Sequence, residues 1–113
     1  MKVELTEDKL IVKFDPLEEI AGIKRELEIP ISLIKDIKPF KDADVKLILR
    51  LGGTSLYKID YGRFETSKGW AFVATDHLDK STVLFLKDFD YDLVILDLNE
   101  NMVEELKKRI LEK

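Results

Sequence analysis

Residues 50–75 read RLGGTSLYKIDYGRFETSKGWAFVAT, and this stretch decides the fold that the sequence predicts. Gly52-Gly53 is a turn signal, because a glycine pair lets the backbone adopt positive φ angles at little steric cost. Residues 61–66 and 70–75 are typical of two strands, and Ser67-Lys68-Gly69 between them suits a type I turn with a glycine bulge. The stretch therefore predicts a strand that ends at the glycine pair, a connector over 55–60 and a β-hairpin.

Before this stretch, apolar and polar residues mostly alternate, which is the period of a half-buried strand. The pattern predicts a hairpin over residues 2–14 and further strands at 23–30, 34–40 and 45–51. Between the first two of these elements, Asp15-Pro16-Leu17-Glu18 combines an Asp cap, a proline at the first helical position and a glutamate three residues after the cap. These signals predict a helix of barely two turns that ends at Gly22. Lys41-Asp42-Ala43-Asp44 is expected to be a loop.

After the central hairpin, residues 76–80 are expected to form a loop, and residues 82–87 and 91–96 a second hairpin across Asp88-Phe89-Asp90. Asp97 or Asn99 then caps a helix that runs to the end of the chain. One face of this helix is apolar, and polar pairs spaced for i,i+4 contact lie outside or at the edge of that stripe. The apolar residues are Met102, Val103, Leu106 and Ile110, and the pairs are Glu104 with Lys108 and Glu105 with Arg109.

Taken together, these elements predict a mainly β fold with a C-terminal α-helix. About seven or more short strands at close spacing suggest a small barrel or a curved sheet, and the final helix is expected to cover its open end. The chain of 113 residues shows no internal repeat and no linker. It is therefore expected to form a single domain, residues 1–113.

Composition excludes several classes of function. The chain has no cysteine, so it offers no disulfide, zinc-thiolate site or cysteine nucleophile. A formal charge of −4 and a pI near 5.1 argue against binding of nucleic acid, and no basic run is present that would reverse this expectation. No apolar run approaches the roughly 20 residues of a membrane span, and the amino terminus lacks the apolar core of a secretory signal. We expect a cytoplasmic protein.

The composition also predicts high thermal stability. The sequence contains no glutamine, only two asparagines and many lysine and glutamate residues. This bias is typical of proteins from very hot environments. We expect a thermophile source and a melting temperature above roughly 80 °C, against about 45 to 65 °C for mesophile domains.

Several short motifs resemble one protein family. Arg50-Leu51-Gly52-Gly53-Thr54 followed by Gly62-Arg63-Phe64, together with Glu28-Ile29-Pro30-Ile31 before Ile34, is similar to the bacterial and archaeal pleckstrin-homology-like (PH-like) domains. The resemblance extends from about Leu10 to the end of the chain. It implies a strongly bent antiparallel sheet, or PH-like barrel, that is closed by a C-terminal helix.

The resemblance does not by itself supply a function, because fold and function are separable. Most prokaryotic members have no assigned activity, whereas eukaryotic relatives bind inositol lipids or peptides. The lipid-binding relatives carry basic residues in their first hairpin loop. That loop here is Thr6-Glu7-Asp8-Lys9, so we do not expect phosphoinositide binding.

Candidate catalytic and metal sites are poorly supported by the sequence. His77 is the only histidine, and a metal site built from Asp76, His77 and Asp79 lacks a second anchor, so a solvated loop is the better interpretation. Neither Ser67 nor Ser81 lies in the sequence context of a nucleophile. The sequence predicts no catalytic residue, no metal ligand and no cofactor.

A ligand site, if present, is expected at the Gly52-Gly53 turn, whose backbone amides can form an anion-binding nest. No lysine and helix start follow it as in a P-loop, so a purely structural turn is the favoured alternative. Aromatic residues such as Trp70, Phe64 and Phe72 can stack on bases, but cross-strand and core roles fit them better without basic flanks. The residues that we associate with the turn as ligand candidates are Arg50, Gly53, Thr54, Tyr57 and Arg63.

The functional hypothesis from sequence is a non-catalytic module that binds a protein partner or forms a homo-oligomer. Exposed sheet edges, which can accept an added strand, are its physical basis. The alternative is a small-ligand or anion binder at the Gly52-Gly53 turn.

Overall fold

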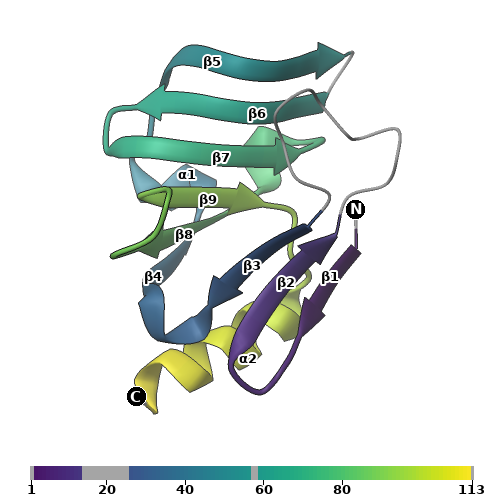
Figure 1. Cartoon of the computed structure of the whole chain (residues 1–113), viewed down its shortest axis with the longest axis vertical. Coiled ribbons are helices and arrows are strands. Elements are labelled where there is room, and N and C mark those ends of the chain that lie inside the picture. The colour runs from purple at the N-terminus through teal and green to yellow at the C-terminus, as the bar shows by residue number, and fades with distance from the viewer. Residues whose placement is uncertain (1, 14–25, 57–58, 113) are drawn as a thin grey trace.

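The computed structural model describes residues 2–13, 26–56 and 59–112, and for residues 50–56 and 59–61 it describes the backbone alone. The helix predicted from Asp15 to Gly22, residues 23–25 of the predicted third strand and the ligand candidate Tyr57 lie outside the described residues. Within them the chain is mainly β, with a C-terminal helix (Figure 1).

A three-stranded antiparallel sheet forms at the amino terminus. Its strands are β1 (Lys2–Leu5), β2 (Lys9–Lys13) and β3 (Glu26–Pro30), in the order β1-β2-β3. The predicted first hairpin is confirmed by the pairing of Val3 with Val12 and of Leu5 with Leu10. Leu10, Val12 and Ile29 are buried, whereas their chain neighbours remain more exposed, as period-two alternation requires.

The other strands form a six-stranded sheet, stacked from β5 to β4 in Figure 1. All neighbouring pairs are antiparallel except β7 and β9, which run parallel. The predicted hairpins over 61–75 and 82–96 are confirmed. In spatial order the strands are β4 (Ile34–Pro39), β8 (Thr82–Leu86), β9 (Leu93–Leu96), β7 (Gly69–Thr75), β6 (Ile59–Thr66) and β5 (Leu47–Leu56).

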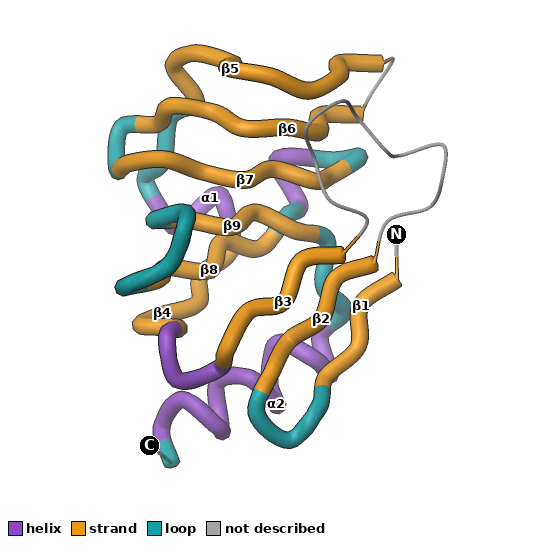
Figure 2. The backbone as a smooth tube through the Cα atoms, in the orientation of Figure 1, coloured by secondary structure: helices purple, strands orange, loops and turns teal. Residues whose placement is uncertain are grey.

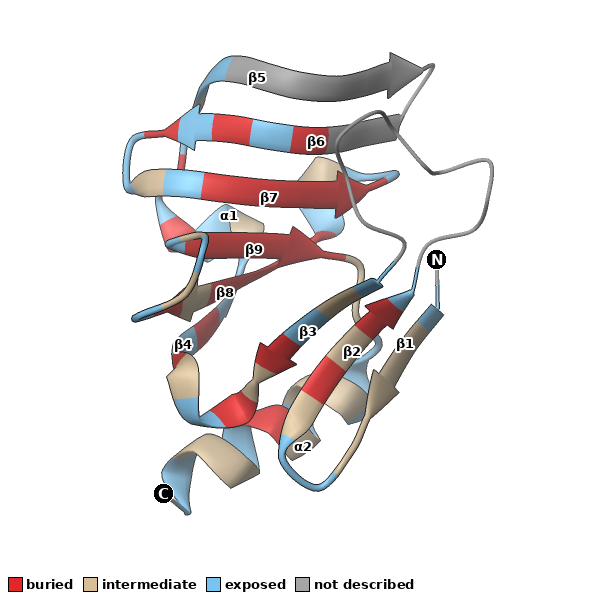
Figure 3. Cartoon of the chain, viewed as in Figure 1, coloured by how far each residue is buried: buried red, intermediate tan, exposed pale blue. Residues whose placement is uncertain are grey.

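Both faces of the six-stranded sheet are covered around β9, which is buried along its whole length (Figure 3). On one face, Val94 and Leu96 pack in a cluster with side chains from the three-stranded sheet and from β4, β7 and β8. On the other face, Leu93 and Ile95 pack with the segment that follows β4 and with Phe64 of β6. A continuous apolar run of this kind is what a strand buried on both faces requires.

The C-terminal helix α2 (Glu100–Leu111) packs against the first of these clusters. Leu106 is fully buried, and Met102, Val103 and Ile110 are partly buried against the same cluster, so the predicted apolar stripe is confirmed. Asn99 is the N-cap, because its side chain accepts a hydrogen bond of 2.8 Å from the Met102 amide.

The neighbouring acid, Asp97, ties two strands of the sheet together instead of capping the helix. It accepts hydrogen bonds from the Thr75 hydroxyl, at 2.5 Å, and from the Asp76 amide, at 3.1 Å. At the other end of the helix, Arg109 pairs with Glu105 at 3.1 Å and donates to the backbone carbonyls of Thr6 and Glu7. These contacts hold the helix against the turn between β1 and β2, as Figure 2 shows.

The expected architecture needs correction in two respects. The described strands form two separate sheets and not one closed barrel. The parallel pairing of β7 with β9 also departs from the antiparallel sheet that the resemblance implies. The reason is the path of the chain: after β7 it passes over to β8, and β9 then returns into the space between β8 and β7.

Three local predictions are also wrong. β5 does not end at Gly52-Gly53 but continues to Leu56, with Gly53 opposite Gly62 of β6. All described residues of the predicted connector over 55–60 therefore belong to strands. The register shifts between Arg50 and Gly52, and glycine inside a strand commonly marks such an irregularity. The predicted loop over 41–44 instead begins with the short helix α1 (Phe40–Ala43), where Ala43 is buried and Phe40 packs on the second cluster.

Candidate interaction surface

The two edges of the six-stranded sheet differ in what they expose. β5 forms one edge and, in the described part of the chain, pairs only with β6. Ile48 and Leu49, near its start, are 63% and 53% exposed. A long edge strand with exposed apolar side chains is a template for pairing with another chain, because its outward N–H and C=O groups lack a neighbouring strand.

A β-bulge brings these two side chains to the surface. Leu47 pairs with Thr66 and Leu49 with Glu65, so Ile48 is an extra residue opposite a single step of β6. One extra residue shifts the alternation of the strand. The apolar face predicted for 45–51 is therefore broken, with Val45 buried but Leu49 exposed.

Exposed side chains continue from β5 across the sheet. Leu49 pairs with Glu65 of β6, and Glu65 in turn pairs with Trp70 of β7, so these three residues form a row on one face. Trp70, the only tryptophan, is 47% exposed. Glu65 separates the exposed leucine from the exposed tryptophan, and an exposed tryptophan is typical of a recognition surface, since aromatic residues are enriched where binding energy is concentrated.

The opposite edge, β4, is protected. Its exposed residues are Lys35, Asp36 and Lys38, and the Lys38 ammonium lies 3.9 Å from the Asp36 carboxylate. Pro39 ends the strand and has no N–H to offer, and helix α2 packs beside β4. Charges, proline and a covering helix are the features that keep an edge strand from pairing with other chains.

A hollow of about 390 Å³ lies beside this row, lined by Arg63, Trp70, Asp90 and Tyr91. Arg63 comes from β6 and Trp70 from β7, whereas Asp90 and Tyr91 belong to the connection between β8 and β9. Since β7 lies between β6 and β9 in the sheet, Trp70 lies between Arg63 and the connection from β8 to β9. We call this set of four residues the aromatic hollow.

The connection that supplies Asp90 and Tyr91 is anchored to the sheet. Asp92 donates its amide to the Trp70 carbonyl at 2.8 Å, and its carboxylate accepts the Trp70 amide at 3.0 Å. Gly69 (φ 122°) leaves the space for this carboxylate, because a Cβ there would lie 2.8 Å from Asp92 Cγ. The aromatic hollow therefore stands on a fixed backbone.

Two tilted ring contacts hold Tyr91 of the aromatic hollow. The Tyr91 ring lies 5.6 Å from that of Phe72 and 6.3 Å from that of Phe89, between centroids. Burial raises the pKa of the Tyr91 phenol; the Arg63 charge opposes this change and the Asp90 charge adds to it. Because that pKa is raised from about 10, the phenol is neutral near pH 7 and keeps its O–H as a donor.

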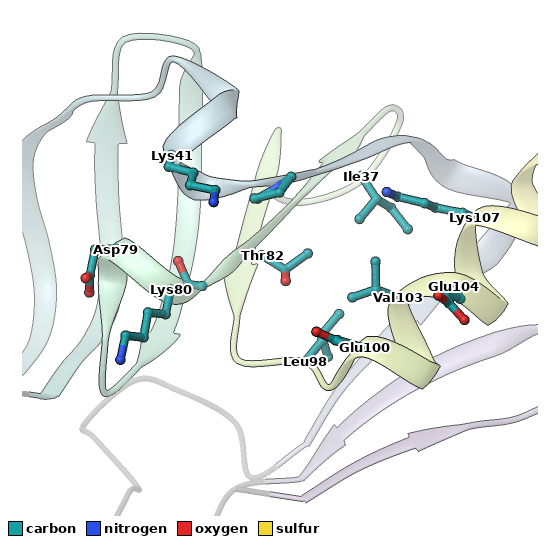
Figure 4. A pocket seen from close by; sticks show the side chains of 12 residues that line it. Ile37, Lys41, Asp79, Lys80, Thr82, Leu98, Glu100, Val103, Glu104 and Lys107 are labelled. Carbon is teal, nitrogen blue, oxygen red and sulfur yellow. The ribbon is translucent and has the colours of Figure 1, made fainter.

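A second hollow, of about 490 Å³, lies between α2 and the end of β4 (Figure 4). Apolar side chains such as Ile37, Leu98 and Val103 point into it. Its rim balances opposite charges, with three lysines (Lys41, Lys80 and Lys107) and three acids (Asp79, Glu100 and Glu104). The rim therefore favours neither an anionic nor a cationic ligand.

The structure describes only part of the ligand site that the sequence predicts. Arg63 lies in the aromatic hollow, and the backbones of Arg50, Gly53 and Thr54 lie in β5. The turn that motivated the anion nest is absent, since both glycines pair with β6. Ligand binding by these residues stays a prediction.

Sequence reasoning missed Asp90, Tyr91, Ile48 and Leu49. The alternation of 45–51 concealed the bulge at Ile48, and no local pattern places Tyr91 beside Arg63. The Trp70 side chain was assigned to cross-strand and core packing, yet it is only half-buried.

Hydrogen bonds tie the loop that carries His77, the only histidine, to the end of β7 and to Asp97. The His77 amide donates to the Thr75 hydroxyl, which in turn donates to Asp97, and the Asp76 amide also binds Asp97. Among the residues that the structure describes, no group of three or more histidine or acidic side chains is placed to hold a metal ion. Within the same residues, no helix has the length and apolar character to cross a membrane.

No protein-family model matches the chain, and comparisons with curated proteins and with solved structures found no match.

Proposed function

We propose that this protein is a non-catalytic interaction module that associates with a second copy of itself through edge strand β5. The observation that carries the proposal is the pair of exposed apolar residues, Ile48 and Leu49, on a ten-residue edge strand. Pairing two such strands would satisfy backbone groups and bury both side chains, which favours association.

The difference between the two sheet edges favours a closed dimer over a chain of copies. Head-to-tail addition would require β5 of one copy to pair with β4 of the next, but β4 is protected by charges, Pro39 and α2. Within the six-stranded sheet, pairing of β5 with β5 of a second copy around a two-fold axis gives a closed assembly. The proposed assembly is therefore an isologous dimer whose sheet continues across the interface.

The test is the mass of the protein in solution, by light scattering after size exclusion and by native mass spectrometry. We expect twice the chain mass of 13.1 kDa. The double variant Ile48→Lys/Leu49→Lys should be a folded monomer, because charges on an edge strand oppose pairing. Leu111→Lys is the matched control, since Leu111 is 85% exposed at the end of α2, and its variant should remain a dimer.

Two results would contradict the proposal. One is a wild-type protein that stays monomeric at every concentration tested, and the other is a double variant that dimerises as the wild type does. In the first case the alternative is that β5 pairs with a strand from a different protein. That outcome can be examined by cross-linking from a cysteine introduced at Ile48.

We also retain the PH-like assignment as a proposal. The mainly β chain with a C-terminal helix packed on the sheets supports it, whereas the parallel β7–β9 pair departs from the sheet expected of that family. The cytoplasmic location and the absence of catalysis likewise stay predictions.

A further inference from the structure

We propose that the aromatic hollow is a binding site for a small zwitterion with an aromatic body, such as a free aromatic amino acid. The described residues that line the site are Arg63, Trp70, Asp90 and Tyr91, around a volume of about 390 Å³. It is distinct from the β5 backbone edge, so it does not depend on self-association.

The two rings of the hollow suit a flat ligand body. Trp70 is half-exposed and can stack on an aromatic ring. Tyr91 is held by its ring contacts with Phe72 and Phe89, so its position is set before a ligand arrives. A ligand that fits a preformed surface avoids much of the entropy cost of ordering side chains.

The charges of the hollow have opposite sign and are not used elsewhere in the described structure. Among the described residues, no side-chain hydrogen bond or ion pair joins the Arg63 guanidinium or the Asp90 carboxylate to a neighbour, and both charges face Tyr91. Arg63 offers a planar guanidinium, which suits a carboxylate, and Asp90 offers a carboxylate, which suits an ammonium group. A ligand that carries both charges satisfies both residues.

The position of these charges in the sheet agrees with this ligand. Arg63 lies on β6 and Asp90 on the connection into β9, with Trp70 of β7 between these elements in the strand order. A bound ring over Trp70 would thus have a cation on one side and an anion on the other. A ligand with only one charge would leave either Arg63 or Asp90 unmatched.

Hydrogen bonds anchor the connection between β8 and β9 to the sheet. The Asp92 amide donates to the Trp70 carbonyl, and the Asp92 carboxylate accepts from the Trp70 amide. The Leu86 amide in turn donates to the Asp92 carbonyl at 2.9 Å. Asp90 and Tyr91 therefore keep their place relative to Trp70.

The experiment uses the intrinsic fluorescence of Trp70, which is the only tryptophan and lies in the proposed site. The probe is L-phenylalanine, with calorimetry as a second readout. Two analogues each remove one charge: 3-phenylpropanoate lacks the ammonium group, and 2-phenylethylamine lacks the carboxylate. We expect L-phenylalanine to bind with a Kd of about 1 mM or tighter, and each analogue to bind at least about tenfold more weakly.

Two variants assign the charges. In Arg63→Met, L-phenylalanine should bind no better than 2-phenylethylamine, and in Asp90→Asn it should bind no better than 3-phenylpropanoate. Asp88→Asn is the matched control, because Asp88 is an exposed acid of the same connection with φ 53°, a conformation that asparagine tolerates. Its affinity should equal that of the wild type.

Three results would overturn the proposal: no binding of L-phenylalanine to the wild type, equal binding of either analogue, or an unchanged affinity in both charge variants. The analogue series uses the unmodified protein, so it decides the question even if a variant fails to fold. Protein concentration is kept constant throughout, so that a change in self-association does not alter the Trp70 signal.

Discussion

The strands β4 and β5 are the two edges of one sheet, yet β4 exposes charged side chains and β5 exposes apolar ones. β4 exposes Lys35, Asp36 and Lys38 and lies beside α2, whereas β5 exposes Ile48 and Leu49 at a bulge. Among the described residues, charges, a proline and a helix protect β4, and no comparable feature covers Ile48 and Leu49 of β5. We infer from this contrast that the apolar surface of β5 is kept for a partner.

The largest expected effect comes from removing the helix that covers β4. Deleting residues 99–113 would expose the cluster around Leu106 and uncover the β4 edge. Burial of the four apolar residues of the helix contributes on the order of 6 to 12 kcal/mol as an upper estimate, which rivals the stability of a typical domain. We expect a product that aggregates or does not fold, measured by solubility and thermal melting.

A soluble truncated protein with a cooperative transition would show that α2 is a detachable arm. In that case the protection of β4 would not depend on the helix. A milder variant, Leu106→Ala, provides a graded version of the same test, with an expected loss of about 2 to 5 kcal/mol.

The next effect concerns β6, which supports β5. Gly62 has φ 143°, is buried and lies between Gly53 and Val73 in the sheet. Gly62→Val should lower the free energy of unfolding by about 1 to 3 kcal/mol, because a side chain is strained in this backbone conformation. Chemical denaturation measures the change.

The same substitution at Gly53 tests the partner strand, and there too we expect a loss of stability. If both variants unfold at the denaturant midpoint of the wild type, the two glycines have no special backbone role and the β5–β6 pairing is more tolerant than we infer.

A smaller effect is expected from removing the charges of β4. The double variant Lys35→Val/Lys38→Val should remain folded, since both side chains are exposed. It should however form assemblies larger than the wild type, because β4 would then resemble β5. Light scattering as a function of concentration detects them, and an unchanged mass would show that Pro39 and α2 protect the edge without the lysines.

The smallest effect involves the edge of the other sheet, β1. Glu4 has its pKa lowered from 4.5, first by the Lys13 charge and also by Lys2, at 3.4 Å from each ammonium. A depressed carboxyl pKa stabilises the fold above the unfolded value, and this contribution disappears as the pH falls through the folded pKa. Glu4→Gln should therefore melt slightly below the wild type at pH 7, and the difference should shrink as the pH falls below 4.5 and through the folded pKa.

The exposure of Glu4 keeps this effect small, since surface ion pairs contribute little. A difference that persists unchanged at low pH would mean that the pairs with Lys2 and Lys13 do not stabilise β1. The matched control is Glu7→Gln, because Glu7 is an exposed acid in the adjoining turn.

Local patterns in the sequence predicted the elements well but not their arrangement. The hairpins over 2–14, 61–75 and 82–96 follow from alternation and turn residues, and Asn99 follows from capping chemistry. The parallel contact of β7 with β9 does not, because it joins strands that are separated by β8 in the sequence. The order of strands in a sheet depends on such non-local contacts.

The errors at β5 have a similar origin. The glycine pair does signal a backbone irregularity, but opposite Gly62 it becomes part of a strand and not a turn. The exposure of Ile48 depends on its position opposite Thr66 and Glu65, which the residues around it do not determine. For the candidate site, Arg63 was predicted, whereas Tyr91 is brought beside it only by the folding of the whole sheet.

Arg109 gives the molecule a further property through its hydrogen bonds to Thr6 and Glu7. The first of these contacts spans 103 positions in the sequence, so it joins the first hairpin to the last helix. During synthesis on the ribosome, β1 and β2 emerge before α2, and their turn can make these bonds only after the final turns of α2 have been added. Contacts between such distant positions slow folding, because a long loop must close before they form. The three-stranded sheet is therefore held against α2 only after Arg109 has been synthesised.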